Sequence, residues 1–287
     1  MTNQLEVALC RSAMYEALAL GFQPPSAKTV SRLLEAENNE ALAELAAIAE
    51  YPRQPGGDAL NSLVQKLAAC SEGKNSAVLK NLYRRLFGHT AHAQAPPYET
   101  EYGAETLFQQ PQQLADLTGF YQAFGLSANS SEHERVDHIS CLCEFLTFLT
   151  RKEAYALEQK DAVMLEEIRR AQKLFLRDHL GRFVPGFTNL LLRENMDGFY
   201  GALGKLCSEF VLQECARFGV PAGPEHLRLR PTEVADDCFT CGGGEEVIRD
   251  LCDAAPACEV ASDADKLINL STKSQITNKC PSPIFTL

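Results

Sequence analysis

The sequence predicts an all-α fold, with a single helical bundle over roughly residues 1–220. Apolar side chains recur every three or four residues in several stretches, which is typical of amphipathic helices. No stretch shows a strong alternation of apolar and polar residues, and no repeat of fixed period is visible. A length of 287 residues and a hydrophobic fraction of 45% are sufficient for a buried core.

Glycine, proline and capping residues divide these stretches into helices. The first helix carries Leu5 and Leu9 and is expected to end near Gly21, because Gly and Pro beyond a helical pattern are stop signals. Asp58 and Ser76 are expected N-caps. Later helices are expected over residues 30–48, 58–67, 76–87, 111–124, 132–158 and 199–218. A further helix is expected to follow residue 158, to reach His179 and to end at Gly181. The last helix is expected to stop at Gly219.

The composition changes after Pro221. Residues 221–287 hold few large apolar side chains and many small polar ones, so we expect a Cys-rich, largely flexible tail outside the 1–220 helical domain. A chain that ends near Pro224 is therefore expected to fold with little change in stability.

The charge balance excludes some partners and favours others. Lys and Arg number 27 against 38 Asp and Glu, a net charge of −11, which argues against nucleic acid and anionic membranes and favours a basic partner peptide. No segment reaches the ~20 apolar residues of a membrane span. The N-terminus lacks the pattern of a signal peptide, so we expect a cytoplasmic protein. Several cysteines fall on apolar helical faces and are expected to be free core residues: Cys141, Cys143, Cys207 and Cys215.

A helix end and the loop that follows form the first candidate site. The helix end carries Tyr83, Leu86 and Phe87, and the loop after Pro96-Pro97 carries Tyr98, Glu99 and Tyr102. One interpretation is structural: the aromatic residues anchor a proline-stiffened loop to the core. The other is a recognition rim, because Tyr offers a rigid face with a hydroxyl and carboxylates pair with cationic peptides.

The second candidate site is the start of the helix expected from residue 132. Glu134, Asp137 and His138 share a polar stripe there with Cys141 and Glu144. The structural interpretation is that acidic residues in a first turn favour the helix dipole by about 0.3–1 kcal/mol each. The functional interpretation is an exposed client-reading surface, in which case changing Asp137 and His138 should cost little stability. The spacing matches no zinc-binding helix motif.

Together these segments resemble the TorD/DmsD/NarJ family of redox-enzyme maturation chaperones over roughly residues 5–220. The residues that carry the resemblance are Tyr83-x-x-Leu86-Phe87, Pro97-Tyr98-Glu99-x-x-Tyr102-Gly103, Glu134-x-x-Asp137-His138-Ile139, and Phe199-Tyr200-x-x-Leu203 with Phe210 and Glu214. The sequence departs from the usual Glu-Pro-x-Asp-His run at Arg135, which stands in place of Pro. The tail is not part of the family pattern.

The resemblance implies a chaperone rather than an enzyme. Its partner would be the immature catalytic subunit of a molybdopterin-dependent oxidoreductase of the DMSO reductase type, together with any twin-arginine signal peptide that this subunit carries. It would assist cofactor insertion, hold back export, require no cofactor of its own, and act as a monomer or homodimer. The client-binding residues implied are Tyr98, Glu99, Tyr102, Glu134, Asp137 and His138, beside the apolar surface of Tyr83, Leu86 and Phe87. Fixed carboxylates suit two guanidinium groups.

The third candidate site is the pair Cys238-x-x-Cys241, followed by Cys252 and Cys258. Four thiolates can hold zinc or an iron–sulfur cluster, although the second pair lacks a standard spacing. The alternatives are incidental thiols and a redox pair at Cys238 and Cys241. A metal or iron–sulfur protein that acts through this tail is thus the second class of function, and a small-molecule enzyme is the third. No phosphate-binding loop or nucleophile elbow supports the third class.

Overall fold

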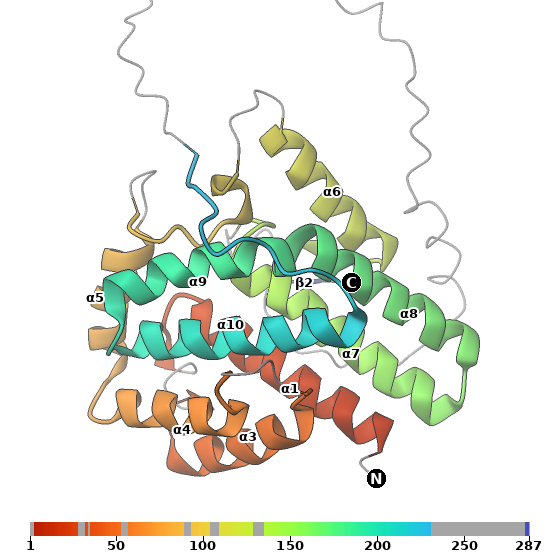
Figure 1. Cartoon of the computed structure of the whole chain (residues 1–287), viewed down its shortest axis with the longest axis horizontal. Helices are drawn as coiled ribbons and strands as arrows, with labels where there is room; N and C mark the ends of the chain where they lie inside the picture. The colour runs from red at the N-terminus through yellow and green to blue at the C-terminus, as the bar shows by residue number, and fades with distance from the viewer. Residues whose placement is uncertain are drawn as a thin grey trace, which may run out of the picture.

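The computed structural model describes residues 3–27, 32–33, 35–52, 57–88, 93–103, 109–128, 135–230 and 285–286. It confirms the all-α fold (Figure 1). The α-helices are α1 (Gln4–Phe22), α3 (Ala36–Ala49), α4 (Leu60–Ser71), α5 (Ser76–Phe87), α6 (Gln109–Ala123), α7 (Ile139–Gln159), α8 (Ala162–Phe175), α9 (Gly181–Asn195) and α10 (Phe199–Phe218). A 3-10 turn, η1 (Glu99–Glu101), and a π-helical turn, η2 (Leu176–Leu180), join them. The two-residue strands β1 (Ser127–Ala128) and β2 (Phe285–Thr286) pair antiparallel.

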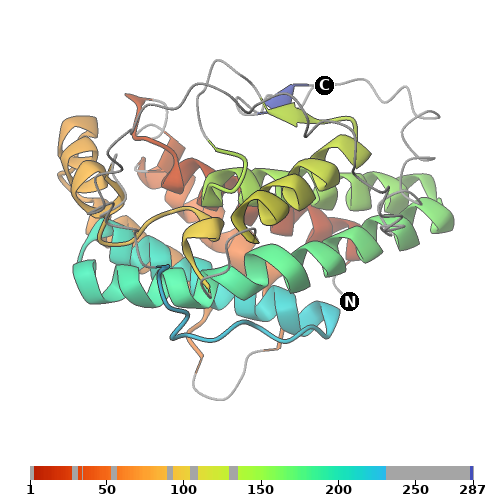
Figure 2. The same ribbon diagram turned by 90° about the horizontal axis from the view of Figure 1, so that it is seen from above.

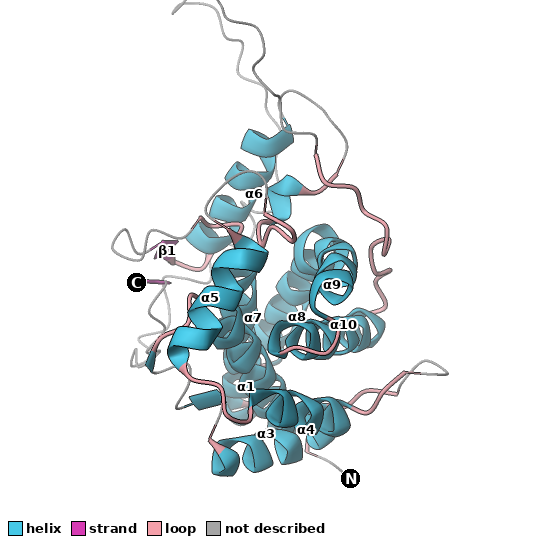
Figure 3. Ribbon diagram, turned by 90° about the vertical axis from the view of Figure 1, so that its left-hand side faces the viewer, coloured by secondary structure: helices cyan, strands magenta, loops and turns pink. Residues whose placement is uncertain are grey.

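The helices are stacked in layers (Figures 1 and 3). α3 packs on α4, and the next layer consists of α1 on α3 and α10 on α4. α7 runs along α1, α8 packs against α7, and α9 runs along α10. α6 lies at the opposite edge, against η1 and β1, so the bundle places η1 between its core and an outlying helix.

One continuous apolar core fills the space between the layers. Aromatic rings make up much of it, and Phe87 touches Tyr83, Phe22 and Tyr200 edge to face. The cysteines expected in the core are buried and free, as predicted. Among the described residues, no helix has the length and apolar character to cross a membrane, and no group of three His, Cys, Asp or Glu is arranged to hold a metal ion.

The observed helix ends agree with some of the predicted start and stop residues and differ from others. The stop at Gly219 is confirmed, because this residue takes a left-handed conformation at φ 62°. The expected caps were each displaced by one residue: Ala59 and Asn75 occupy the cap positions, rather than Asp58 and Ser76. Asp58 instead lies 3.5 Å from the Lys205 ammonium group.

The expected helix end at Gly181 was wrong, because the chain continues through η2 directly into α9. Gly181 is helical, and a Cβ atom there would lie 2.6 Å from the Cys215 sulfur, so the glycine permits close packing on α10. Within α9, Pro185 has no N–H to donate to the Gly181 carbonyl. The N–H of Gly223 donates to that carbonyl instead, at 2.9 Å.

That hydrogen bond begins a segment that we call the strap, residues 221–230, which runs back along α9 (Figures 1 and 2). The Asn189 amide donates to the Glu225 carbonyl, and the N–H of Gly103 donates to the Arg228 carbonyl. The contacts of the bundle therefore extend ten residues beyond the boundary expected at residue 220. Residues 231–284, most of the expected tail, lie outside the described residues.

Candidate functional site

The two segments that carry the family resemblance pair with each other. The N–H of Ile139 donates to the Pro97 carbonyl at 2.8 Å, and the N–H of Glu99 donates to the Asp137 carbonyl at 3.0 Å. Tyr98 and His138 form an antiparallel bridge between these bonds. We call residues 96–103 and 135–139 the motif corner. The loop and the helix start, two separate candidate sites in the sequence, are therefore neighbours in the fold.

The Asp137 carboxylate is the centre of the motif corner and is fully buried. It accepts hydrogen bonds from the Thr100 backbone N–H at 3.2 Å and from the Thr100 hydroxyl at 2.7 Å. The Arg135 guanidinium donates to both carboxylate oxygens, at 3.0 and 2.9 Å. Because both oxygens accept these bonds, Asp137 fixes the loop to the helix start.

His138 is the N-cap of α7 and is fully buried as well. Its Nδ1 accepts from the Ser140 backbone N–H at 3.2 Å, and its ring meets the Tyr98 ring edge to face. Burial and, to a smaller extent, the neighbouring Arg135 charge together lower the pKa of His138 to about 3. His138 is therefore neutral at physiological pH and acts as a hydrogen-bonding cap.

The expectation of an exposed polar stripe on this helix was wrong. Asp137, His138, Cys141 and Glu144 are all buried: the loop of residues 96–103 pairs with residues 137–139, and the Gln23 amide donates to Glu144 at 2.7 Å. The helix itself begins at Ile139 rather than near residue 132. Glu134 lies outside the described residues.

Glu99 forms a second buried ionic cluster on the other side of η1. The Arg182 guanidinium donates to one of its oxygens at 2.7 Å, and His179 Nδ1 lies 3.2 Å from the other. His179 Nε2 lies 3.3 Å from Asp116 on α6, an ion-pair distance without hydrogen-bond geometry. Burial by itself lowers the pKa of His179, but the contacts with Asp116 and Glu99 outweigh it and raise the pKa to about 9. His179 is therefore a buried cation that links η1 to α6.

The aromatic residues of the predicted site anchor the loop to the core, as the structural interpretation proposed. Tyr102 is fully buried, donates its hydroxyl to the Pro96 carbonyl at 2.9 Å, and packs on the Phe183 ring. Tyr83, Leu86 and Phe87 are buried in the core beneath it. Of the site residues predicted within the described chain, only Tyr98 keeps part of its side chain at the surface.

The surface of the motif corner is formed by Tyr98, Glu101 and Arg135. The Arg135 guanidinium lies over the Tyr98 ring, 4.4 Å from its centroid, and pairs with Glu101 at 3.0 Å. Its side chain is 42% exposed. The sequence marked Arg135 only as a departure from the family pattern, yet it holds the corner together. Arg182 and His179 were missed, since nothing near them in the chain indicates Glu99 as their partner.

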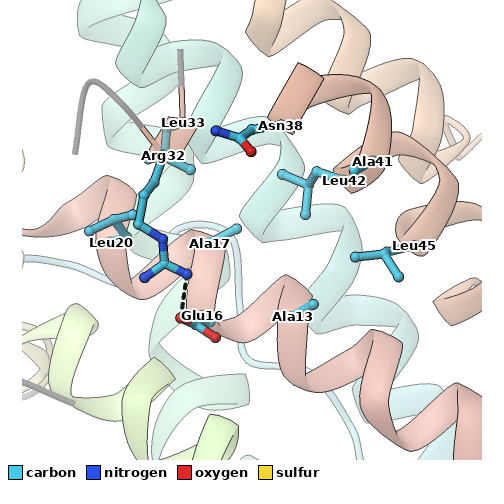
Figure 4. A pocket seen from close by; sticks show the side chains of 10 residues that line it. All are labelled: Ala13, Glu16, Ala17, Leu20, Arg32, Leu33, Asn38, Ala41, Leu42 and Leu45. Carbon is cyan, nitrogen blue, oxygen red and sulfur yellow. Dashed lines mark hydrogen bonds and ion pairs between the residues drawn. The ribbon is translucent and has the colours of Figure 1, made fainter. Parts of the chain in front are cut away.

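An apolar hollow lies between α1 and α3, separate from the motif corner (Figure 4). Its volume is about 210 Å³, and its walls are mainly alanine and leucine side chains. The charged pair Glu16 and Arg32, 2.6 Å apart, stands at one side. The hollow can accept a small apolar group beside a fixed ion pair.

The fold and the motif corner together define the class of protein. It is a helical bundle in which a loop is hydrogen-bonded to the start of a central helix. The family described as nitrate reductase delta subunit matches residues 32–189, just over half of the chain and including the motif corner. The chain belongs to this family, which confirms the resemblance seen in the sequence. No solved structure matches the chain with significance.

Curated relatives match part of the chain. The perchlorate reductase assembly chaperone protein of Dechloromonas aromatica (strain RCB) is 32% identical over 101 residues, 35% of this chain and 44% of the relative. The selenate reductase assembly chaperone protein of Thauera selenatis is 32% identical over 109 residues, 38% of this chain and 54% of the relative. The chlorate reductase assembly chaperone protein of Ideonella dechloratans is 32% identical over 106 residues, 37% of this chain and 53% of the relative. The chain thus spans about half the length of these relatives.

Proposed function

We propose that this chain is an assembly chaperone for a molybdopterin-dependent reductase. It binds the immature catalytic subunit, assists cofactor insertion, and holds back export where that subunit carries a twin-arginine signal. In this proposal the protein is not an enzyme, acts in the cytoplasm as a monomer or homodimer, and needs no cofactor of its own. The cysteines predicted to bind zinc or an iron–sulfur cluster, Cys238, Cys241, Cys252 and Cys258, lie outside the described residues, so that site stays a prediction.

The observation that carries the proposal is the motif corner. It is formed by the segments of the family resemblance, and it lies inside the region that matches the nitrate reductase delta subunit family. The three curated relatives bear the names of reductase assembly chaperones, which supports the same role. The fully buried Asp137 and Glu99 give the corner a fixed backbone, and preorganised surfaces bind at lower entropic cost.

We place the client contact on the exposed face of this corner, at Tyr98, Glu101 and Arg135. The Tyr98 ring supplies apolar area, and Glu101 supplies a carboxylate for a cationic client segment. The buried members of the predicted site support this face without touching the client.

The test is affinity purification of the tagged full-length chain from its native host, followed by identification of the proteins that copurify. We expect a large molybdopterin-binding reductase subunit to be enriched. Glu101→Lys should reduce that enrichment about tenfold, because it replaces the carboxylate of the exposed face with a second cation beside Arg135. Glu158→Lys makes the same charge change at the exposed end of α7 and should leave the enrichment unchanged.

The two parts of the proposal can fail separately. If no reductase subunit copurifies with the unaltered chain, the assembly role is wrong. If the subunit copurifies equally with both variants, the role stands but the client binds elsewhere, with the α1–α3 hollow as the next surface to change.

A further inference from the structure

A second, larger hollow lies at the end of the bundle where α1, α8 and the C-terminal end of α10 meet. Its volume is about 620 Å³. Five of its eleven lining residues are cations: Arg11, Arg169, Arg170, Lys173 and Arg217. Two lining residues are carboxylates, Glu153 and Glu166, so cations outnumber carboxylates in this wall although the chain as a whole carries −11.

The floor of this cationic hollow is a fixed network around Arg11, which is only 2% exposed. The Arg11 guanidinium pairs with Glu153 at 2.7 Å and with Glu214 at 2.6 Å. Arg169 binds the other Glu153 oxygen at 2.7 Å, and Arg217 shares Glu214 Oε1 with Arg11 at 2.9 Å. Glu214 lies beneath Arg11 and does not line the hollow. When it is included, the count is five cations against three carboxylates. Hydrogen bonds to the buried Glu153 and Glu214 hold Arg11, Arg169 and Arg217 in place, while Arg170 and Lys173 are exposed, so cations predominate in the wall of the hollow.

The chain itself contains a segment of complementary charge. Residues 231–265 include ten carboxylates and a single cation, Arg249, so this segment carries −9 of the net charge of −11. The other 252 residues carry only −2 between them. An acidic polypeptide of this composition fits a wall of guanidinium and ammonium groups, which prefer carboxylate partners.

From these observations we infer that the cationic hollow is a binding site for acidic polypeptide and that its ligand is residues 231–265 of this chain. Chain length permits the contact. Phe218, which lines the hollow, lies only twelve positions before Arg230, the last residue of the strap. At ~3.3–3.6 Å per extended residue, twelve residues span at most about 43 Å. An equal length of chain after Arg230 is sufficient to return to the hollow, so the carboxylates from Glu245 onward are within reach of it.

The expected contact is reversible and sensitive to salt. Each exposed ion pair strengthens binding by a factor of only about 1.4 to 5, so a few pairs give weak affinity on their own. Covalent attachment supplies an effective concentration in the millimolar range, which is enough to populate such a contact. An acidic segment of another protein would compete for the same hollow.

The test is zero-length carbodiimide coupling of lysine amines to carboxylates in the full-length chain, read by mass spectrometry. Lys173 lines the hollow, whereas Lys66 on α4 and Lys80 on α5 are exposed elsewhere and serve as references. At low ionic strength we expect Lys173 to couple to carboxylates of residues 245–265 at least fivefold more than either reference lysine. The yield should not depend on protein concentration, and it should fall at 0.5 M salt, where screening is strong.

Arg170→Glu reverses one charge of the wall while keeping Lys173 available, and it should lower the coupling at least fivefold. Arg193→Glu makes the same change at an exposed site on α9 and should leave the coupling unaltered. Equal coupling of the segment to Lys173, Lys66 and Lys80 would overturn the inference, as would coupling at Lys173 that ignores both salt and Arg170→Glu. A yield that rises with protein concentration would also overturn it, because it would assign the segment to a second molecule.

Discussion

The motif corner and the Arg11 network both bury carboxylates against guanidinium groups, but the chain assembles them differently. In the corner, Asp137 and its partner Thr100 belong to two short segments that pair through their backbones. In the network, Arg11 meets Glu153 and Glu214, which lie 142 and 203 residues away on other helices. Short motifs marked both partners of the first cluster, whereas in the second only Glu214 belonged to a motif, and nothing in the sequence paired it with Arg11 or Glu153. Sequence motifs therefore report residues that fix local backbone geometry.

The two clusters also differ in solvent access. Arg11 is 2% exposed and its two carboxylates are nearly as buried, whereas the Arg135 side chain is 42% exposed. Water stabilises a charge left without its partner at the surface and cannot do so inside the bundle. We therefore expect the Arg11 network to have the larger effect on stability, and the predictions below test that order.

Arg11→Met should destabilise the protein most, by about 3–5 kcal/mol, because Glu153 and Glu214 would remain buried without their main cation. Guanidinium unfolding at pH 7 measures the loss. Arg32→Met is the matched control, since Arg32 pairs with Glu16 at the surface with a side chain 46% exposed. That control should cost less than about 1 kcal/mol. Similar losses of stability in the two variants would show that burial does not separate the Arg11 network from an exposed ion pair.

Asp137→Asn combined with His138→Ala should cost about 3 kcal/mol, in contrast to the small loss that the sequence alone suggested. The variant weakens the bonds to Thr100 and Arg135 and removes the cap of α7. Thermal unfolding gives the loss, and client binding is measured in parallel at a temperature where the variant is folded. A variant as stable as the unaltered chain would show that the corner is not structural.

His179 should make stability depend on pH. Its pKa is raised to about 9 in the folded chain, against about 6.5 when unfolded. A raised pKa means that its contribution is complete below pH 6.5 and is lost as pH rises toward 9. His179→Gln should therefore be less stable than the unaltered chain by roughly 3 kcal/mol at pH 6 and nearly equal to it at pH 9.5. Urea unfolding of both chains across that range measures the difference, and a constant difference would contradict a charged His179.

Truncation should have the smallest effect. A chain that ends at Arg230 keeps the strap and should unfold like the full-length chain. A chain that ends at Pro224 loses the hydrogen bonds that Glu225, Arg228 and Arg230 make to the bundle through their backbones. Its free energy of unfolding should fall by roughly 1 kcal/mol. The loss is small because ordering the strap costs conformational entropy, which offsets part of the energy of these bonds. Chemical unfolding of both chains measures the difference in stability. Equal stability would show that the strap does not contribute and that the helical domain ends at residue 220.

The sequence by itself determined the all-α class, most helix positions, the stop at Gly219 and the two segments that meet in the corner. These features follow from local rules, because helical periodicity, left-handed glycine and proline-stiffened loops act over a few residues. The same locality explains the errors. Gly181 matches a stop signal in the sequence but serves close packing against Cys215.

Only the tertiary structure decided the burial of Asp137 and His138, the ionic cluster of Glu99, and the Arg11 network. A periodic pattern shows which face of a helix a residue occupies, but it cannot show that a loop will cover that face. A buried charge is tolerated only when partners from distant segments pair with it. The residues next to one partner in the sequence do not indicate where the other partner lies. Burial and charge pairing are for this reason properties of the assembled bundle.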